Sequence, residues 1–125
     1  MAMPAERLGI LLISGGHARA HYAFVVATAA AAIGRDVTLF ATNDGCRGLL
    51  ADLHGFEIQD KASRRLGVAG LAELRQAAFE LGIRVIACES GLRLAGVTEP
   101  LAQGVEISGM VSFLSATAGG QVITL

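Results

Sequence analysis

Five stretches of the chain carry the apolar pattern of buried β-strands. Residues 8–13 form a continuous apolar run, as expected of a strand that is covered on both faces. Residues 36–40 and 83–87 repeat this pattern, and the shorter segments 104–107 and 121–125 are further candidates. The pattern predicts a sheet of four or five strands.

Two helical patterns connect the strands. An alanine-rich segment from residue 20 to residue 33 ends at Gly34, and glycine commonly follows the last turn of a helix. A second, amphipathic helix is predicted to end at Gly82, with the inward residues Leu71, Leu74, Ala78 and Leu81. Because strand, helix and strand follow one another, we expect right-handed crossovers and a mostly parallel sheet. The predicted fold class is α/β with three α/β/α layers.

The middle of the chain has a weaker pattern. We expect a short helix over residues 46–54, after which Phe56 and Ile58 could form a brief strand. Residues 59–65 are polar and charged, which predicts a solvated, mobile loop whose charges face water.

Two further helix starts are expected near the end of the chain. Thr98 is a good N-cap residue and Pro100 fits a first helical turn. Ser108 could cap another helix that continues to about residue 118. The residues of that helix expected to point inward are Met110, Val111, Leu114 and Ala118.

The composition is that of a compact protein. The chain has 125 residues, 53% hydrophobic and 17% charged, which predicts one domain over residues 1–125 and excludes a disordered chain. Mean hydropathy is high, at +0.55. However, the longest apolar stretch, residues 22–33, has only 12 residues, and a membrane-spanning helix needs roughly 20. The surplus of apolar residues instead predicts self-association.

Charge and cysteine content exclude further classes. The net charge is −1, with one Tyr, no Trp and no basic stripe, which argues against a nucleic-acid partner. Residues 1–7 lack the pattern of a signal peptide, so a cytoplasmic location is expected. The two cysteines, Cys46 and Cys88, are too few for a disulfide framework, and their spacing matches no zinc motif.

Candidate chemistry gathers where three predicted strands end. If the strands are parallel, the loops that follow them share one edge of the sheet, where ligands commonly bind in α/β proteins. These loops carry His17, His21, Asn43, Asp44, Cys46 and Cys88. Cys88 comes first, because backbone N–H groups at a helix start favour a thiolate, although Glu89 next to it acts in the opposite direction. The alternative is that Cys88 is a small core residue.

The other residues at this edge have several possible roles. His17 could give a proton to Cys88 or take one from it, and His17 with His21 would need a third ligand to hold a metal, so no metal site is predicted. Cys46 could resolve a bond formed at Cys88 if their Cα atoms lie within about 7 Å, or it could pack under a helix.

A binding role is the alternative to thiol chemistry. Gly15 and Gly16 precede a helix and could cradle an anion, although no nucleotide-binding motif is present. The protein would then be a non-catalytic, oligomeric small-molecule or anion-binding module. The binding residues expected under either function are Gly15, Gly16, Asn43, Glu89 and Ser90.

Several segments together resemble the DsrE/DsrF-like family. They are residues 86–88 with a short helix after them, residues 104–110 and residues 113–114 before a final apolar strand. The first half of the chain also resembles the amino-terminal half of those proteins. It has an apolar strand, a small polar loop, an alanine-rich helix and the apolar segment 37–40. The similarity covers nearly the whole chain and is most specific from residue 83 to residue 114.

This resemblance implies a sulfur-relay or sulfurtransferase-type protein that assembles into homotrimers or hexamers. Cys88 occupies the position of the family's cysteine, which carries sulfur as a persulfide and passes it to a partner protein. Cys46 matches no sulfur-carrying position. The role requires no cofactor, and the sequence has no cofactor motif. Both enzymatic turnover and simple sulfur carriage are compatible with the resemblance.

Overall fold

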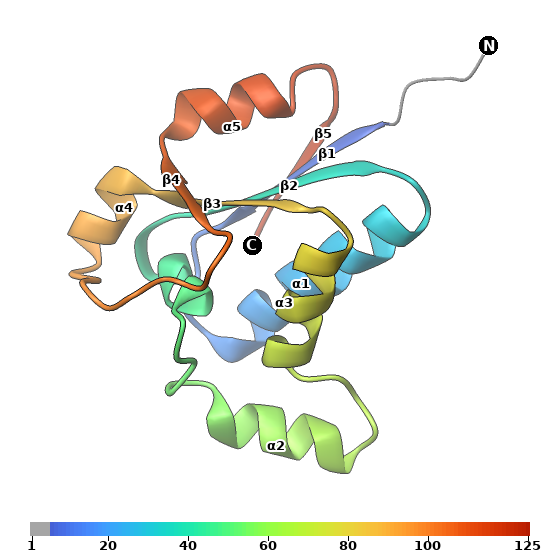
Figure 1. The fold of residues 1–125 in the computed structure, drawn as a ribbon, viewed down its shortest axis with the longest axis vertical. Helices are drawn as coiled ribbons and strands as arrows, with labels where there is room; N and C mark the ends of the chain where they lie inside the picture. The colour runs from blue at the N-terminus through green and yellow to red at the C-terminus, as the bar shows by residue number, and fades with distance from the viewer. Residues whose placement is uncertain (1–5) are drawn as a thin grey trace.

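The computed structural model describes residues 6–125 and contains a five-stranded sheet (Figure 1). The prediction for residues 1–7 therefore falls mostly outside the described part. The strand order is β4-β3-β2-β1-β5, and every pairing in the sheet is parallel. The strands are β1 Arg7–Leu12, β2 Asp36–Ala41, β3 Arg84–Cys88, β4 Glu106–Ser108 and β5 Gln121–Thr124. The predicted parallel α/β sheet is confirmed.

Side chains of the central strands alternate between two apolar layers. On one face, α1 (His17–Ala32) and α3 (Leu71–Glu80) pack on residues such as Ile10, Leu39 and Val85. On the other face, α5 (Met110–Ala116) places Phe113 against Phe40, Ile86 and Cys88. Figure 1 shows these helices on opposite sides of the sheet. The three predicted layers are therefore present, and Cys88 belongs to the layer that α5 covers.

The two longest predicted helices are close to their expected limits. α1 begins three residues before the expected start, which places His17 in its first turn. Gly34 and Gly82 follow α1 and α3 with φ angles of 90° and 76°. Glycine adopts this left-handed conformation without steric cost, so these two positions end the helices as predicted.

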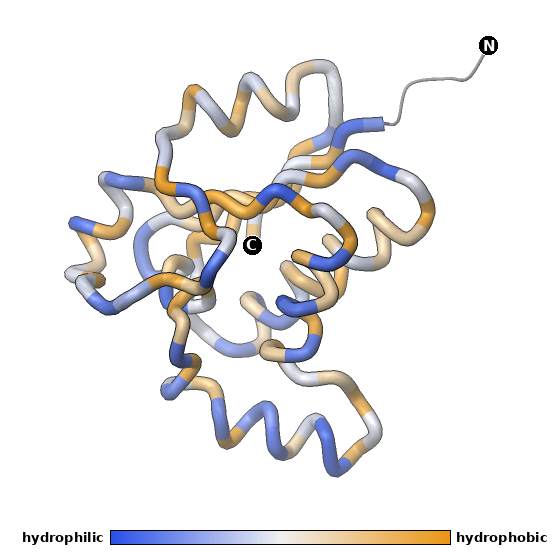
Figure 2. The backbone as a smooth tube through the Cα atoms, in the orientation of Figure 1, coloured by the Kyte–Doolittle hydropathy of each residue, from blue (hydrophilic) through white to orange (hydrophobic). Residues whose placement is uncertain are grey.

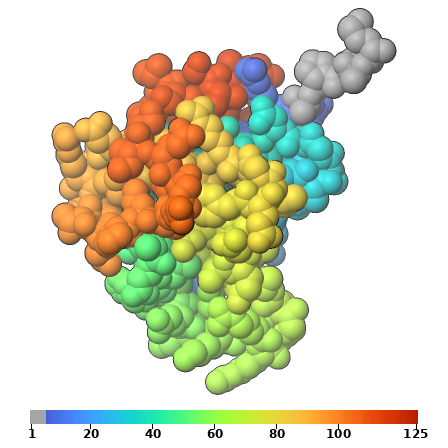
Figure 3. All heavy atoms as spheres, viewed as in Figure 1, coloured from blue at the N-terminus to red at the C-terminus, as the bar shows by residue number. Residues whose placement is uncertain are grey.

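The prediction of a loop over residues 59–65 is wrong. These residues lie in α2 (Glu57–Arg65), which Figure 2 shows as mostly hydrophilic and Figure 3 shows at one end of the molecule. The suggested strand at Phe56 and Ile58 is also wrong, since Ile58 lies in the helix and is exposed. Asp60 is the one buried residue within α2. The helix therefore has no apolar stripe from which it could be predicted.

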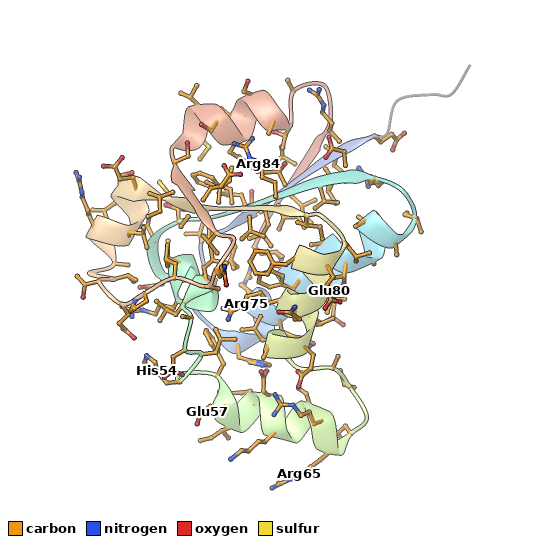
Figure 4. The ribbon with its side chains drawn as sticks, in the orientation of Figure 1. His54, Glu57, Arg65, Arg75, Glu80 and Arg84 are labelled. Carbon is orange, nitrogen blue, oxygen red and sulfur yellow. The ribbon has the colours of Figure 1, made fainter. Side chains whose placement is uncertain are left out.

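The charges of this segment do not all face water. Glu57 and Arg65 point away from the body of the protein (Figure 4), but the Asp60 side chain is only 5% exposed. Asp60 accepts hydrogen bonds from the backbone N–H groups of Leu71 (2.8 Å) and Ala72 (3.2 Å) at the start of α3. It thereby joins α2 to α3.

Two predicted short helices are absent from the structure in the form expected. Residues 46–54 do not form one helix; instead a 3₁₀-helix, η1 (Asn43–Leu49), begins directly after β2. Arg75 of α3 donates to the carbonyl oxygens of Gly48 (3.0 Å) and Leu50 (2.6 Å), so it satisfies two acceptors at the end of η1 (Figure 4). No helix begins at Thr98. Residues 97–105 are a loop, held by an antiparallel bridge between Leu50 and Leu101.

The inward face predicted for the last helix is wrong. α5 begins after Gly109 and buries Phe113, with Thr117 buried directly after its end. The residues expected to be inward, Met110, Val111, Leu114 and Ala118, are exposed. Gly9 of β1 explains the orientation, since a Cβ atom there would lie 2.6 Å from Thr117 and 2.8 Å from Phe113. The missing side chain lets α5 approach the sheet along this line.

No helix within residues 6–125 has the length and apolar character needed to cross a membrane.

Candidate functional site

Cys88 lies at the carboxyl edge of the sheet, where β3 passes into α4 (Glu89–Leu94). It is the last residue of β3 and the N-cap residue of α4. Ser108 of β4 lies beside it in register, and Ala87 is paired with Ala41 of β2. The residue is 7% exposed, so it is largely but not completely covered. This is the position that the sequence pattern predicts for the thiol.

Uncharged donors surround the sulfur atom. Cys88 Sγ accepts a hydrogen bond from the Gly91 N–H (3.4 Å) and lies 3.2 Å from Ser90 Oγ. Burial alone would raise the pKa of the Cys88 thiol, but the Ser90 hydroxyl, the Gly91 N–H and the Thr42 hydroxyl together lower this pKa below its ordinary value. Hydrogen bonds to a charged form favour that form. The geometry therefore favours a thiolate at Cys88.

The donors come from two chain segments that touch at Gly91. A Cβ atom on Gly91 would lie 2.2 Å from Thr42 Oγ1 and 2.6 Å from the Asn43 backbone nitrogen. Asn43 itself has a φ angle of 51°, a left-handed conformation that is uncommon for a residue with a side chain. The first turn of α4 thus rests directly on the junction of β2 and η1, which brings Thr42 to the thiol.

An ion pair reduces the effect of the Glu89 charge on the neighbouring Cys88 thiol. Its Oε1 atom lies 2.9 Å from Arg93 Nη2 on the exposed side of α4. The neighbouring guanidinium partly balances the carboxylate that the sequence places next to Cys88.

We expect Ser90→Ala to raise the pKa of Cys88 and to slow its reaction with iodoacetamide roughly tenfold at pH 7. A hydrogen bond to a charged group contributes about 1.5–3 kcal/mol, and a pKa unit corresponds to about 1.4 kcal/mol. Reaction rates measured across a pH series give the pKa directly. Ser115→Ala, which removes an exposed hydroxyl of α5, is the matched control. Equal pKa values in both variants would mean that Ser90 does not stabilise the thiolate.

Cys46 has the opposite environment. It is fully buried in the layer under α1 and α3, and its Sγ donates to the Ala41 carbonyl oxygen at 3.5 Å. Burial, with a further contribution from nearby Cys88, raises the pKa of Cys46 to about 11. A neutral, enclosed thiol fits the packing role proposed from the sequence better than the resolving role.

The two histidines of α1 are engaged away from the thiol. His17 Nε2 lies 2.7 Å from Asp60 Oδ1, and His21 Nε2 lies 2.8 Å from the Ala69 carbonyl oxygen. Their rings stack with centroids 5.4 Å apart. No hydrogen bond among residues 6–125 joins either histidine to Cys88. The proton-transfer role of His17 therefore stays a prediction without a supporting contact.

Within the described residues, no group of three or more His, Cys, Asp or Glu side chains is arranged to hold a metal ion.

The glycine loop lies beside a separate small cavity. Gly16 is the N-cap residue of α1, and its N–H donates to Ser14 Oγ at 3.3 Å. Gly15 borders a cavity of about 150 Å³, which is also lined by Arg47, Leu50, Asp52, Leu53, His54, Gly55 and Phe56. The hypothesis that this loop binds an anion or small molecule stays a prediction. The cavity is where such a ligand would bind.

Two important residues were absent from the sequence prediction. Thr42 could have been found, because it is a hydroxyl residue directly after the second predicted strand at the same edge. Asp60 gave no signal, because its partner His17 lies 43 residues away in the sequence.

The fold and the site together define a small α/β/α protein with a thiol of lowered pKa at the carboxyl edge of a parallel sheet. The model of the DsrE/DsrF-like family matches residues 7–125. The chain therefore belongs to the DsrE/DsrF-like family, as the resemblance implied.

Comparison with solved structures gives the same fold. The crystal structure of the YchN protein from E. coli superposes with a TM-score of 0.72 at 19% sequence identity, covering 96% of this chain and 99% of that one. A search of curated proteins finds no match.

Proposed function

We propose that the protein is a sulfur-relay protein of the DsrE/DsrF-like family in which Cys88 carries sulfur as a persulfide. The observation that supports this most is the contact of Cys88 Sγ with the Ser90 hydroxyl and the Gly91 N–H, which, with a smaller contribution from Thr42, lowers the pKa of the thiol. The family match over residues 7–125 supports the same role.

The proposed chemistry needs only thiolates and a donor of sulfane sulfur. The Cys88 thiolate attacks the terminal sulfur of a donor persulfide or polysulfide, forming a new S–S bond while the donor's own S–S bond breaks and its sulfur leaves as a thiolate or a shortened polysulfide. An acceptor thiolate then attacks the outer sulfur, and Cys88 leaves as the thiolate. No net oxidant or reductant is consumed. The same donors that stabilise the Cys88 thiolate stabilise it as a leaving group.

An exposed apolar surface near this site supports self-association. It consists of Ile107 of β4 with Met110, Val111 and Leu114 of α5, which are 59%, 40%, 83% and 55% exposed. Figure 3 shows β4 and α5 as one continuous part of the surface that also adjoins α4. We propose that this surface is covered in a homotrimer or hexamer, or by a protein that gives or receives sulfur. A cytoplasmic location fits the proposal, because a reducing compartment keeps Cys88 as a thiol.

We expect incubation with polysulfide to add the mass of one sulfur atom to the protein, located by peptide mass spectrometry on Cys88. Cys46→Ser should gain the same mass, because that thiol is buried and neutral. Cys88→Ser should gain none. An equal gain by Cys88→Ser, or no gain by the unmodified protein from polysulfide or a protein persulfide, would contradict the relay function.

A further inference from the structure

A second polar pocket lies at the amino-terminal edge of the sheet, opposite Cys88. Arg7 begins β1, Arg35 precedes β2, and Gly119 and Gly120 precede β5. Because these three strands are parallel, the residues meet at one edge. A strand of six residues, such as β1, spans about 20 Å. The pocket is therefore separated from the proposed sulfur-relay site by the length of the strands.

The pocket has room for a small molecule. Its volume is about 280 Å³, and it is lined by Glu6, Arg7, Arg35, Gly119, Gly120 and Gln121. The two glycines leave the floor of the pocket free of side chains. At Gly120 this is required, since a Cβ atom would lie 2.2 Å from the Arg7 carbonyl oxygen.

Neutral acceptors hold both arginines in place. Arg7 Nη1 donates to the Ala118 carbonyl oxygen at 3.1 Å, and Arg35 Nη2 donates to Gln121 Oε1 at 3.2 Å. Neither bond neutralises a positive charge. Two guanidinium groups, each with donors to spare, thus border one pocket, and guanidinium groups stay protonated in proteins.

Arg35 also has a donor that lacks an acceptor. Its Nε atom is buried and has no hydrogen-bond partner among the described residues. The nearest carboxylate oxygen, Glu6 Oε2, is 3.9 Å away, which is too long for a hydrogen bond. The Glu6 side chain is 83% exposed. The Glu6 carboxylate therefore lies near the Arg35 guanidinium but accepts no hydrogen bond from Nε.

We propose that this pocket binds the anionic group of a small molecule, a carboxylate or a tetrahedral oxyanion, between Arg7 and Arg35, and that Glu6 is a weak internal competitor for the same position. An oxyanion that displaces the Glu6 carboxylate gives Arg35 Nε an acceptor. It also places negative charge between two cations, for which guanidinium geometry is well suited. This proposal does not depend on the sulfur-relay function.

The test is a titration of the full-length protein with inorganic phosphate, sulfate and acetate at constant ionic strength, with chloride as the reference. Thermal unfolding reports stabilisation by a bound ion, and backbone amide NMR shifts report where it binds. We expect saturable stabilisation by at least one of the three ions, with shifts at Arg7, Arg35 and residues 119–121. The ion with the tightest binding distinguishes a carboxylate ligand from a phosphate-like or sulfate-like one.

Substitutions at the pocket should change the affinity for the anion in opposite directions. Arg35→Gln and Arg7→Gln should weaken binding roughly tenfold or more, the loss expected for a charge-assisted hydrogen bond. Glu6→Gln should tighten it, because a competing carboxylate is removed. Arg19→Gln, an exposed charge on α1, should leave it unchanged. An equal response of all four variants, a loss of affinity in Glu6→Gln, or shifts confined to other parts of the chain would overturn the proposal.

Discussion

Cys88 is expected to react with iodoacetamide at least about tenfold faster than Cys46 in the folded protein at pH 7. The pKa of Cys46 is about 11, whereas the pKa of Cys88 lies below the ordinary 9.0. A gap of more than two units gives Cys88 a thiolate fraction over about 100-fold larger. Its lower intrinsic nucleophilicity offsets roughly tenfold of this difference. The complete burial of Cys46 increases the ratio further.

Peptide mass spectrometry after timed labelling measures both rates in one sample. Cys46→Ser should keep the fast reaction, and Cys88→Ser should lose it. In urea the two rates should converge, because unfolding removes both the donors around Cys88 and the burial of Cys46. If Cys46 labels as fast as Cys88 in the folded protein, the donor arrangement around Cys88 does not control its reactivity.

The second large effect concerns stability. Asp60→Ala is expected to lower the free energy of unfolding by roughly 2–3 kcal/mol, because leaving buried hydrogen-bonding groups without their partner costs about 1–3 kcal/mol. The substitution removes the partner of His17 and leaves the N–H groups of Leu71 and Ala72 without their acceptor. Urea unfolding followed by circular dichroism measures the loss. Glu57→Ala, an exposed carboxylate in the same helix, should cost less than about 1 kcal/mol. Similar losses in both variants would contradict the anchoring role.

The contribution of Asp60 should also depend on pH in a defined direction. Burial alone would raise the pKa of Asp60, but His17 and the two backbone N–H groups lower it below the ordinary 3.8. A lowered carboxylate pKa stabilises the native state above the ordinary pKa, and this stabilisation is lost as the pH falls through the lowered value. The stability difference between the protein and Asp60→Asn should therefore shrink as the pH falls below about 4, which urea unfolding at a series of pH values measures.

Sequence periodicity predicted those elements whose burial repeats regularly. β1, β2 and β3 are covered on both faces and appear as apolar runs, and α3 has one apolar stripe. α2 could not be predicted in this way, because its buried carboxylate Asp60 attaches it to the body of the protein through His17 of α1 and the first N–H groups of α3. The direction of α5 depends on the absence of a side chain at Gly9, in a strand about a hundred residues earlier. Such long-range causes leave no local pattern.

The candidate site was predictable to a similar degree. The position of Cys88 follows from the end of an apolar run, and its place beside the end of β2 follows from parallel topology. The role of Thr42 depends on the close approach of Gly91 to the β2–η1 junction, a tertiary contact between residues far apart in the chain. The Ser90 hydroxyl and the Gly91 N–H lower the pKa of the thiol most and are local to Cys88, whereas the smaller contribution of Thr42 required the structure.

Because successive side chains along β3 point to opposite faces of the sheet, the position of a residue in this strand determines which layer its side chain enters. Ala87 points into the closed layer under α1 and α3, and Cys88 points into the layer under α5, which borders the exposed apolar surface. A slip of β3 by one residue would exchange the two faces. A cysteine brought to the position of Ala87 would then be sealed in the closed layer, as Cys46 is. The shared register of β2 and β3 therefore determines that Cys88, and not Ala87, lies in the layer that borders the exposed apolar surface.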